Sequence, residues 1–117
     1  MNEATREEAG IDQKPRAKFL SRHDQATRIL DAVSQATGVT VPGLLSRERT
    51  RTIAEARHLA AWLLRNRTRL SFLEIGAVLG GRDHTTIMAA VRAHARRSAS
   101  DTYLAQAEAA VVELLGD

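Results

Sequence analysis

The chain has 117 residues, the length of one domain, and its 44% hydrophobic content is mainly aliphatic because aromatic residues make up only 3%. This composition favours closely packed helices over a β-sandwich. There is no cysteine, which excludes disulfides and thiolate metal sites. No apolar run is long enough to cross a membrane, and the polar N-terminus does not resemble a signal peptide. We therefore expect a soluble cytoplasmic protein.

Charge is distributed unevenly along the chain, although the net charge is only +3. Residues 47–97 contain 11 arginines and 4 acidic residues, whereas the remainder contains 6 basic and 10 acidic residues. A basic middle between acidic flanks indicates a surface that binds a polyanion. A solvated charged face explains the same composition equally well.

The first part of the chain is predicted to hold one long helix. Residues 1–20 are polar and lack periodicity, so we expect a disordered leader. Apolar residues at helical spacing predict a helix over 22–37, which Gly38 ends. Residues 39–42 are expected to be extended, and Gly43–Leu45 to form a short helical turn.

Residues 46–52 carry arginines at alternate positions, Arg47, Arg49 and Arg51. The segment is polar and lies between apolar segments, which predicts an exposed basic loop. Such a loop can hold phosphates or place an arginine in the minor groove of DNA. A plain solvent-facing connection is the equal alternative.

A helix is predicted from residue 53 to 66. Its buried stripe leaves Arg57 and Arg65 at the edge, where the stems can pack and the guanidinium groups reach outward. Trp62 falls on the opposite side, and we expect it to pack beneath another segment rather than stack on a base.

The next stretch is typical of a helix-turn-helix. Ser71 and Glu74 form a capping box that begins a helix over 72–79. Gly76 within it indicates a close helix–helix approach. Residues 80–86 read Gly-Gly-Arg-Asp-His-Thr-Thr; the two glycines suit a sharp turn, and Asp83 is a good N-cap for a second helix over 83–97.

The helix over 83–97 has two different faces. One is apolar, with His94 expected to pack on the core, and the other is small, hydroxylated and basic, as in Thr85, Ala89, Arg92 and Arg96. An outer face of this kind suits entry into the major groove of DNA. A final acidic, Ala-rich helix is predicted over 101–115, within a C-terminal segment of residues 98–117.

These motifs resemble the C-terminal DNA-binding domain of the bacterial replication initiator DnaA. The resemblance covers residues 22–97 and depends most on the motif at 80–86. It implies an all-α helical bundle with a helix-turn-helix at 21–97. The implied partner is double-stranded DNA carrying a DnaA-box-like element of the TTATCCACA type.

The resemblance also implies residue roles. Arg49 matches a loop arginine that enters the minor groove, and Met88 matches an apolar position near thymine methyl groups. The remaining implied DNA-binding residues are Arg51, Arg57, His58, Arg65, Arg82, Asp83, His84, Thr85 and Thr86. The sequence departs from the family at Ala56 and Leu73, where proline is common, and at His58, where glutamine is frequent.

The sequence has no Gly-x-x-x-x-Gly-Lys-Ser/Thr loop and only two lysines, Lys14 and Lys18, so we expect no nucleotide cofactor. Neither a catalytic nor a metal site is expected, because adjacent His84 and Asp83 do not face each other on a helix. We expect a monomeric, nucleoid-associated regulator of replication initiation or transcription that acts without ATP hydrolysis. The alternative is an adaptor that binds the initiator or its regulators through its terminal segments.

Overall fold

The structure, a computed structural model, describes residues 21–116, and over this range it is helical, as predicted. The predicted leader, residues 1–20, lies outside the described residues. The helices are α1 (Arg22–Thr37), α2 (Val41–Leu45), α3 (Arg51–Arg67), α4 (Phe72–Val78), α5 (His84–Ser98) and α6 (Thr102–Leu115).

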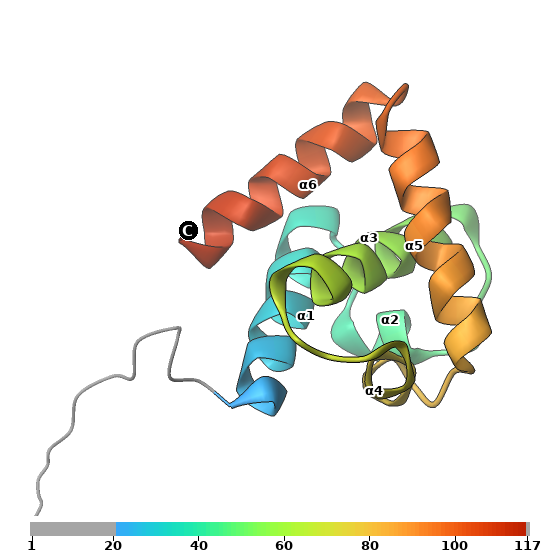
Figure 1. Cartoon of the computed structure of the whole chain (residues 1–117). Coiled ribbons are helices and arrows are strands. Elements are labelled where there is room, and N and C mark those ends of the chain that lie inside the picture. The colour runs from blue at the N-terminus through green and yellow to red at the C-terminus, as the bar shows by residue number, and fades with distance from the viewer. Residues whose placement is uncertain (1–20, 117) are drawn as a thin grey trace, which may run out of the picture.

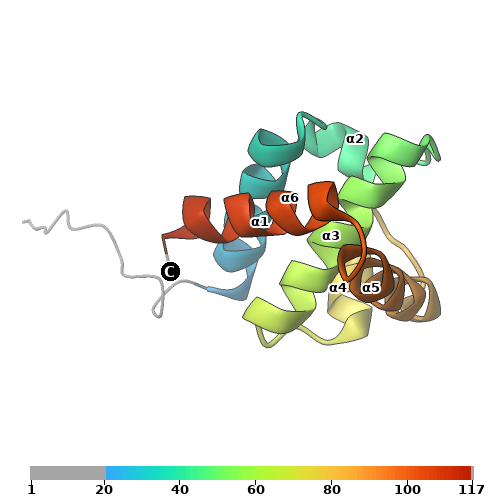
Figure 2. The same cartoon turned by 90° about the horizontal axis from the view of Figure 1, so that it is seen from above.

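Helix α3 is the centre of the bundle. It contacts α1, α2, α4 and α5, and the other helices surround it in both views (Figures 1 and 2). α5 lies along α3 at one edge of the molecule, and α6 then turns back across α1. One long face of α5 is therefore left without a covering helix.

The core is aliphatic and runs through all six helices. α3 supplies its centre with Leu59, Leu63 and Leu64, each at most 2% exposed. Helix α6 belongs to the same core, because its Ala107, Val111 and Leu115 are buried in it. Burying side chains of this size contributes roughly 1.5–3 kcal/mol each relative to exposure.

Helix α6 is also fastened at its end. The guanidinium of Arg28 on α1 donates a hydrogen bond to the carbonyl of Leu115 at 2.9 Å. A cation at a helix C-terminus satisfies a free carbonyl and complements the helix dipole.

Helix α2 corrects one expectation, since Val41 and Pro42 are helical rather than extended. The Thr40 hydroxyl caps this helix by accepting a hydrogen bond from the Gly43 amide at 3.1 Å. Proline fits the first turn of a helix because no intrahelical bond is required of its nitrogen there. The cap outweighs the extended tendency of the preceding residues.

The turn between α4 and α5 packs at backbone level. The Gly76 carbonyl accepts hydrogen bonds from the amides of Gly81 at 2.9 Å and Arg82 at 2.8 Å. A Cβ at Gly76 would lie less than 3.0 Å from the Arg82 carbonyl oxygen, and one at Gly80 equally close to that of Leu45. The close approach predicted for Gly76 is thus tightest against the turn, and Ile87 of α5 lies at ordinary contact distance from the same position, 3.7 Å.

None of the helices between residues 21 and 116 combines the length and apolar character needed to span a membrane.

Gly76→Ala is expected to destabilise the protein. Helix propensity alone would stabilise it by about 1 kcal/mol, whereas the clash with the Arg82 carbonyl should cost roughly 1–3 kcal/mol. Urea unfolding followed by circular dichroism decides the sign. Gly38→Ala is the control, because a Cβ there meets nothing within 4 Å and its cost comes from the positive φ of 79° alone. A Gly76→Ala protein more stable than the wild type would contradict the packing described.

Candidate nucleic-acid interface

A basic cleft of about 700 Å³ separates the α2–α3 loop, residues 46–50, from α5. Its charged lining consists of five arginines and one aspartate: Arg47, Arg49, Arg57, Arg82, Arg96 and Asp83. The loop and the helix with the motif at 80–86 are distant in sequence, and the fold places them on one cleft because both pack on α3. We call this surface the basic cleft.

Arg57 forms the floor of the cleft. The prediction that its guanidinium group reaches outward is wrong, because the group points inward. Arg57 is 8% exposed. Its Nε donates a hydrogen bond to the Leu44 carbonyl at 2.8 Å, and its Nη2 donates to the carbonyls of Gly43 at 3.3 Å and Ser46 at 3.0 Å. These carbonyls belong to the C-terminal end of α2, where free acceptors and the negative end of the helix dipole attract a cation. Arg57 therefore positions the loop that follows α2.

Arg82 ties the glycine turn to the same point. Its Nη1 donates to the Leu79 carbonyl and its Nη2 to the Ser46 carbonyl. Ser46 thus accepts from both Arg57 and Arg82. Two guanidinium groups on one carbonyl fix the start of the basic loop relative to the start of α5.

The arginines of the cleft repel one another. Burial and the charge of Arg82 lower the pKa of Arg57, and burial and the charge of Arg47 lower the pKa of Arg82. Arginine stays protonated even so, because its ordinary pKa lies far above neutral pH. The cleft therefore carries a concentrated positive charge, which a polyanion would neutralise.

The start of α5 is built by Asp83. Its carboxylate accepts hydrogen bonds from the Thr85 amide at 3.0 Å and from the Thr85 hydroxyl. The Thr85 hydroxyl and then the Thr85 amide hold the pKa of Asp83 below its ordinary value. His84 stands beside it, with Nδ1 3.7 Å from the carboxylate Oδ1. Asp83 therefore caps α5 and orients the exposed threonine.

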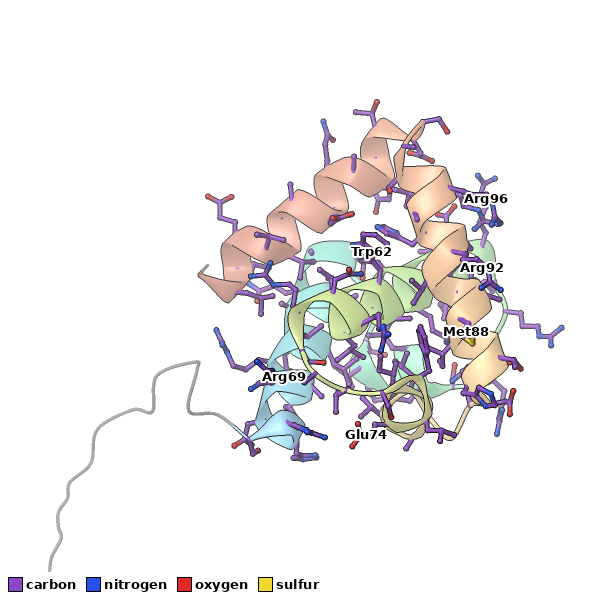
Figure 3. All side chains as sticks on the ribbon, in the orientation of Figure 1. Trp62, Arg69, Glu74, Met88, Arg92 and Arg96 are labelled. Atoms are coloured by element: carbon purple, nitrogen blue, oxygen red, sulfur yellow. The ribbon has the colours of Figure 1, made fainter. Side chains whose placement is uncertain are left out.

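The outer face of α5 is exposed as predicted at Thr85, Ala89, Arg92 and Arg96. Figure 3 shows Arg92 and Arg96 on the side of α5 that faces away from the bundle. Thr86 is also exposed, and it lines the basic cleft. Met88 is half-buried.

Arg47 and Arg96 line the basic cleft but are absent from the residues to which the resemblance assigns a role. Both had a signal in the sequence. Arg96 follows Thr85 by eleven residues, about three helical turns, and Arg47 shares the alternation of the loop arginines.

Two histidines lie behind the outer face. His58 is half-buried and lines the cleft, and its Nδ1 has no hydrogen-bond partner among the described residues. His94 is 1% exposed and pairs with Glu108 of α6, with 2.8 Å between Nε2 and Oε1. The ring of Trp62 lies 5.7 Å from that of His94. His94 thus packs on the core, as predicted, and Trp62 packs beneath α5 and not on the exposed face.

Arg51 and Arg65 do not line the basic cleft. Arg51 is the first residue of α3 and pairs with Glu55, with 3.1 Å between Nε and Oε2. Arg65, near the other end of α3, stacks its guanidinium 4.1 Å from the centre of the Phe72 ring. The DNA contacts predicted for these two arginines remain predictions.

No group of histidine, aspartate and glutamate side chains within residues 21–116 is arranged to hold a metal ion.

Comparison with known proteins connects this geometry to one family. A family model described as "Bacterial dnaA protein helix-turn-helix" matches residues 26–93. The chain is similar to the chromosomal replication initiator protein DnaA of Chloroflexus aggregans, with 40% identity over 83 residues, 71% of this chain and 17% of the relative. The DnaA protein of Neisseria meningitidis is 42% identical over 78 residues, 67% of this chain and 15% of the relative. The chain thus spans less than a fifth of the curated relatives it matches.

Arg57→Met is expected to destabilise the protein by about 1–3 kcal/mol, because it leaves buried carbonyl groups at the end of α2 without a donor. Methionine keeps the apolar stem. The free energy of unfolding from urea titration measures the loss. Arg65→Met is the matched control and should cost less, since it loses an exposed cation–π contact that contributes only about 0.5–1 kcal/mol and one long hydrogen bond to the Leu70 carbonyl, at 3.5 Å. Equal losses in the two variants would contradict the inward role of Arg57.

His58 is expected to make the folded protein sensitive to mild acid. Burial, followed by the charges of Arg97, Arg57 and His94, lowers the pKa of His58, with Glu55 opposing them. The unfolded chain, with an ordinary pKa of about 6.5, therefore takes up a proton before the folded chain does. The stabilisation is present above that value and is lost as pH falls through the lower folded pKa.

The measurement is the free energy of unfolding at a series of pH values from neutral to mildly acidic, for the wild type and for His58→Gln. The wild type should lose stability more steeply than His58→Gln, because the two proteins differ only at this side chain. Parallel curves would show that His58 does not carry this dependence.

Proposed function

The chain belongs to the bacterial DnaA helix-turn-helix family, and on that premise we propose that it binds duplex DNA at DnaA-box-like sequences and controls the initiation of chromosomal replication. One observation carries the proposal. The exposed start of α5 and the loop arginines Arg47 and Arg49 share one basic cleft. A helix and a neighbouring basic loop can then engage adjacent grooves of one duplex.

Helix α5 is the reading element. The major groove of B-DNA is about 12 Å wide and admits one α-helix, and the uncovered face of α5 offers Thr85, Thr86 and Arg92. Threonine methyl groups suit the thymine methyl, and arginine suits guanine O6 and N7. His84 at the first position of the helix adds ring nitrogens for hydrogen bonds to base edges.

Asp83 acts mainly by positioning. A carboxylate repels phosphate, so its contribution to binding is to hold the Thr85 hydroxyl by accepting a hydrogen bond from it. That hydrogen bond fixes the rotamer of Thr85, which then presents its methyl group and the two lone pairs of its hydroxyl oxygen in a defined direction. Preorganised contacts of this kind lose less conformational entropy on binding.

The loop supplies the second contact. Arg49 is exposed beyond the fixed Ser46 carbonyl, and arginine is attracted to the negative potential of a narrow, A·T-rich minor groove. The other cleft arginines contribute salt-dependent attraction to phosphates, which sets affinity more than sequence preference.

Binding in this way involves residues 47–96 and needs no nucleotide. We propose a monomer on an asymmetric site, acting at the nucleoid and sharing sites with the initiator. The same binding mode would serve transcription control at similar sites, and occupancy of origin and promoter fragments in cells distinguishes the two roles.

Arg49→Ala is expected to weaken binding to a box duplex by about 1–3 kcal/mol, roughly 5- to 150-fold. Thr85→Val should mainly reduce the preference for the box over a scrambled duplex, because valine keeps a methyl group but cannot bond Asp83. Fluorescence anisotropy with both duplexes, at two salt concentrations and without nucleotide, measures affinity and preference together.

Arg28→Ala is the matched control for Arg49→Ala, since it removes the same charge from α1, where the side chain bonds the Leu115 carbonyl and does not line the cleft. Box preference that survives the higher salt supports sequence reading. Equal and salt-sensitive binding to both duplexes would leave a general DNA-binding surface. Absence of binding to either duplex would refute the proposal and favour an adaptor for the initiator.

A further inference from the structure

A second basic cavity lies outside the basic cleft. It occupies about 420 Å³ where the start of α1 meets the end of α3 and the connection to α4. Figure 3 places Arg69 beside α1, on the side of the molecule away from Arg92 and Arg96. The lining residues are Arg22, Gln25, Asn66, Arg67, Thr68 and Arg69.

The charge of this cavity is positive. Among residues 21–116, three arginines and no acidic residue line it, and the N-terminal end of the 16-residue α1 adds the positive end of its dipole, which Asp24 in the first turn partly offsets. Glu74 pairs with Arg22 at 3.2 Å, but both side chains are about half exposed. Solvent weakens such a pair, so it leaves the cavity available to an anion.

The neutral lining residues are compatible with a phosphate group. They are two amides and one hydroxyl, of which the Asn66 amide and the Thr68 hydroxyl already donate to the carbonyls of Trp62 and Leu64, so the arginines supply the main contacts to an anion. A protein partner would be expected to find aromatic or other apolar anchors, and a single strand would need aromatic side chains on which bases stack. The part of the chain that the structure describes contributes neither kind of side chain to the lining.

We propose that Arg22, Arg67 and Arg69 form a second site for the phosphate backbone of duplex DNA, so that one molecule bridges two duplex segments. The inference rests on the proposed function, because the first segment is held in the basic cleft. The second site contacts backbone only and has no sequence preference of its own.

The test uses the full chain and two duplexes of about one and a half helical turns, roughly 15 base pairs each. A box duplex is attached to beads, and a fluorescent duplex without the box is added with and without protein. The wild type should capture the second duplex. Arg67→Gln/Arg69→Gln should lose most of this capture while binding a single box duplex as tightly as the wild type does.

Arg67→Lys/Arg69→Lys is the charge-matched control and should retain part of the capture. A longer single duplex identifies the source of the phosphates. If the glutamine variant weakens binding to it and lowers the salt slope by about 0.9 for each lost phosphate contact, the second segment lies on the same molecule. Capture of the fluorescent duplex shows instead that the second segment can lie on a separate DNA molecule.

Undiminished capture by the glutamine variant, as expected from self-association, would overturn the proposal. The proposal would also be overturned if the glutamine variant bound every duplex as tightly as the wild type does but no longer bound an acidic protein partner. NMR of the Arg69 side chain distinguishes failure of the second site from failure of the proposed function. If the Arg69 resonance shifts on adding box-free duplex but the protein does not prefer the box, the second site is supported and the proposed function is refuted. If the protein prefers the box but the Arg69 resonance does not shift and no second duplex is captured, the proposed function is supported and the second site is refuted.

Discussion

The interface depends on one carbonyl group. Ser46 ends α2, and its oxygen accepts hydrogen bonds from Arg57 of α3 and Arg82 of the glycine turn. Three segments that are distant in sequence meet there, and the basic loop leaves from that point. Since each hydrogen bond from a charged donor contributes about 1.5–3 kcal/mol, the loop and α5 are held relative to each other before any ligand arrives. Arg57 and Arg82 thus use their charge inward to fix the position of the loop, which leaves the exposed arginines for the proposed contacts with DNA.

The glycine turn complements this junction. Gly76 and Gly80 allow backbone to approach backbone at distances that no side chain permits, and Arg82 can reach Ser46 only because the turn lies so close to α2. The motif at 80–86 therefore combines residues with different tasks. Its glycines and arginine build the junction, whereas Asp83, His84 and the threonines form the exposed start of α5.

Local features of the sequence predicted much of the fold. The Ser71–Glu74 capping box and the Asp83 N-cap are patterns within four residues, and both form as expected. The direction of Arg57 could not be predicted in this way, because its acceptors lie 11 to 14 residues earlier and are placed by the packing of α2. The second basic cavity escaped sequence reasoning for the same reason, since Arg22 and Arg69 meet only in the folded chain.

Trp62 is the single tryptophan of the chain, and it lies against the ring of His94, which in turn pairs with Glu108 of α6. The indole of Trp62 therefore lies at the junction of α3, α5 and α6 and not on the exposed face of α5. The intrinsic fluorescence of Trp62 therefore reports how these three helices pack. Fluorescence changes on adding DNA would report a rearrangement transmitted through α5, since a duplex on the outer face does not touch the fluorophore.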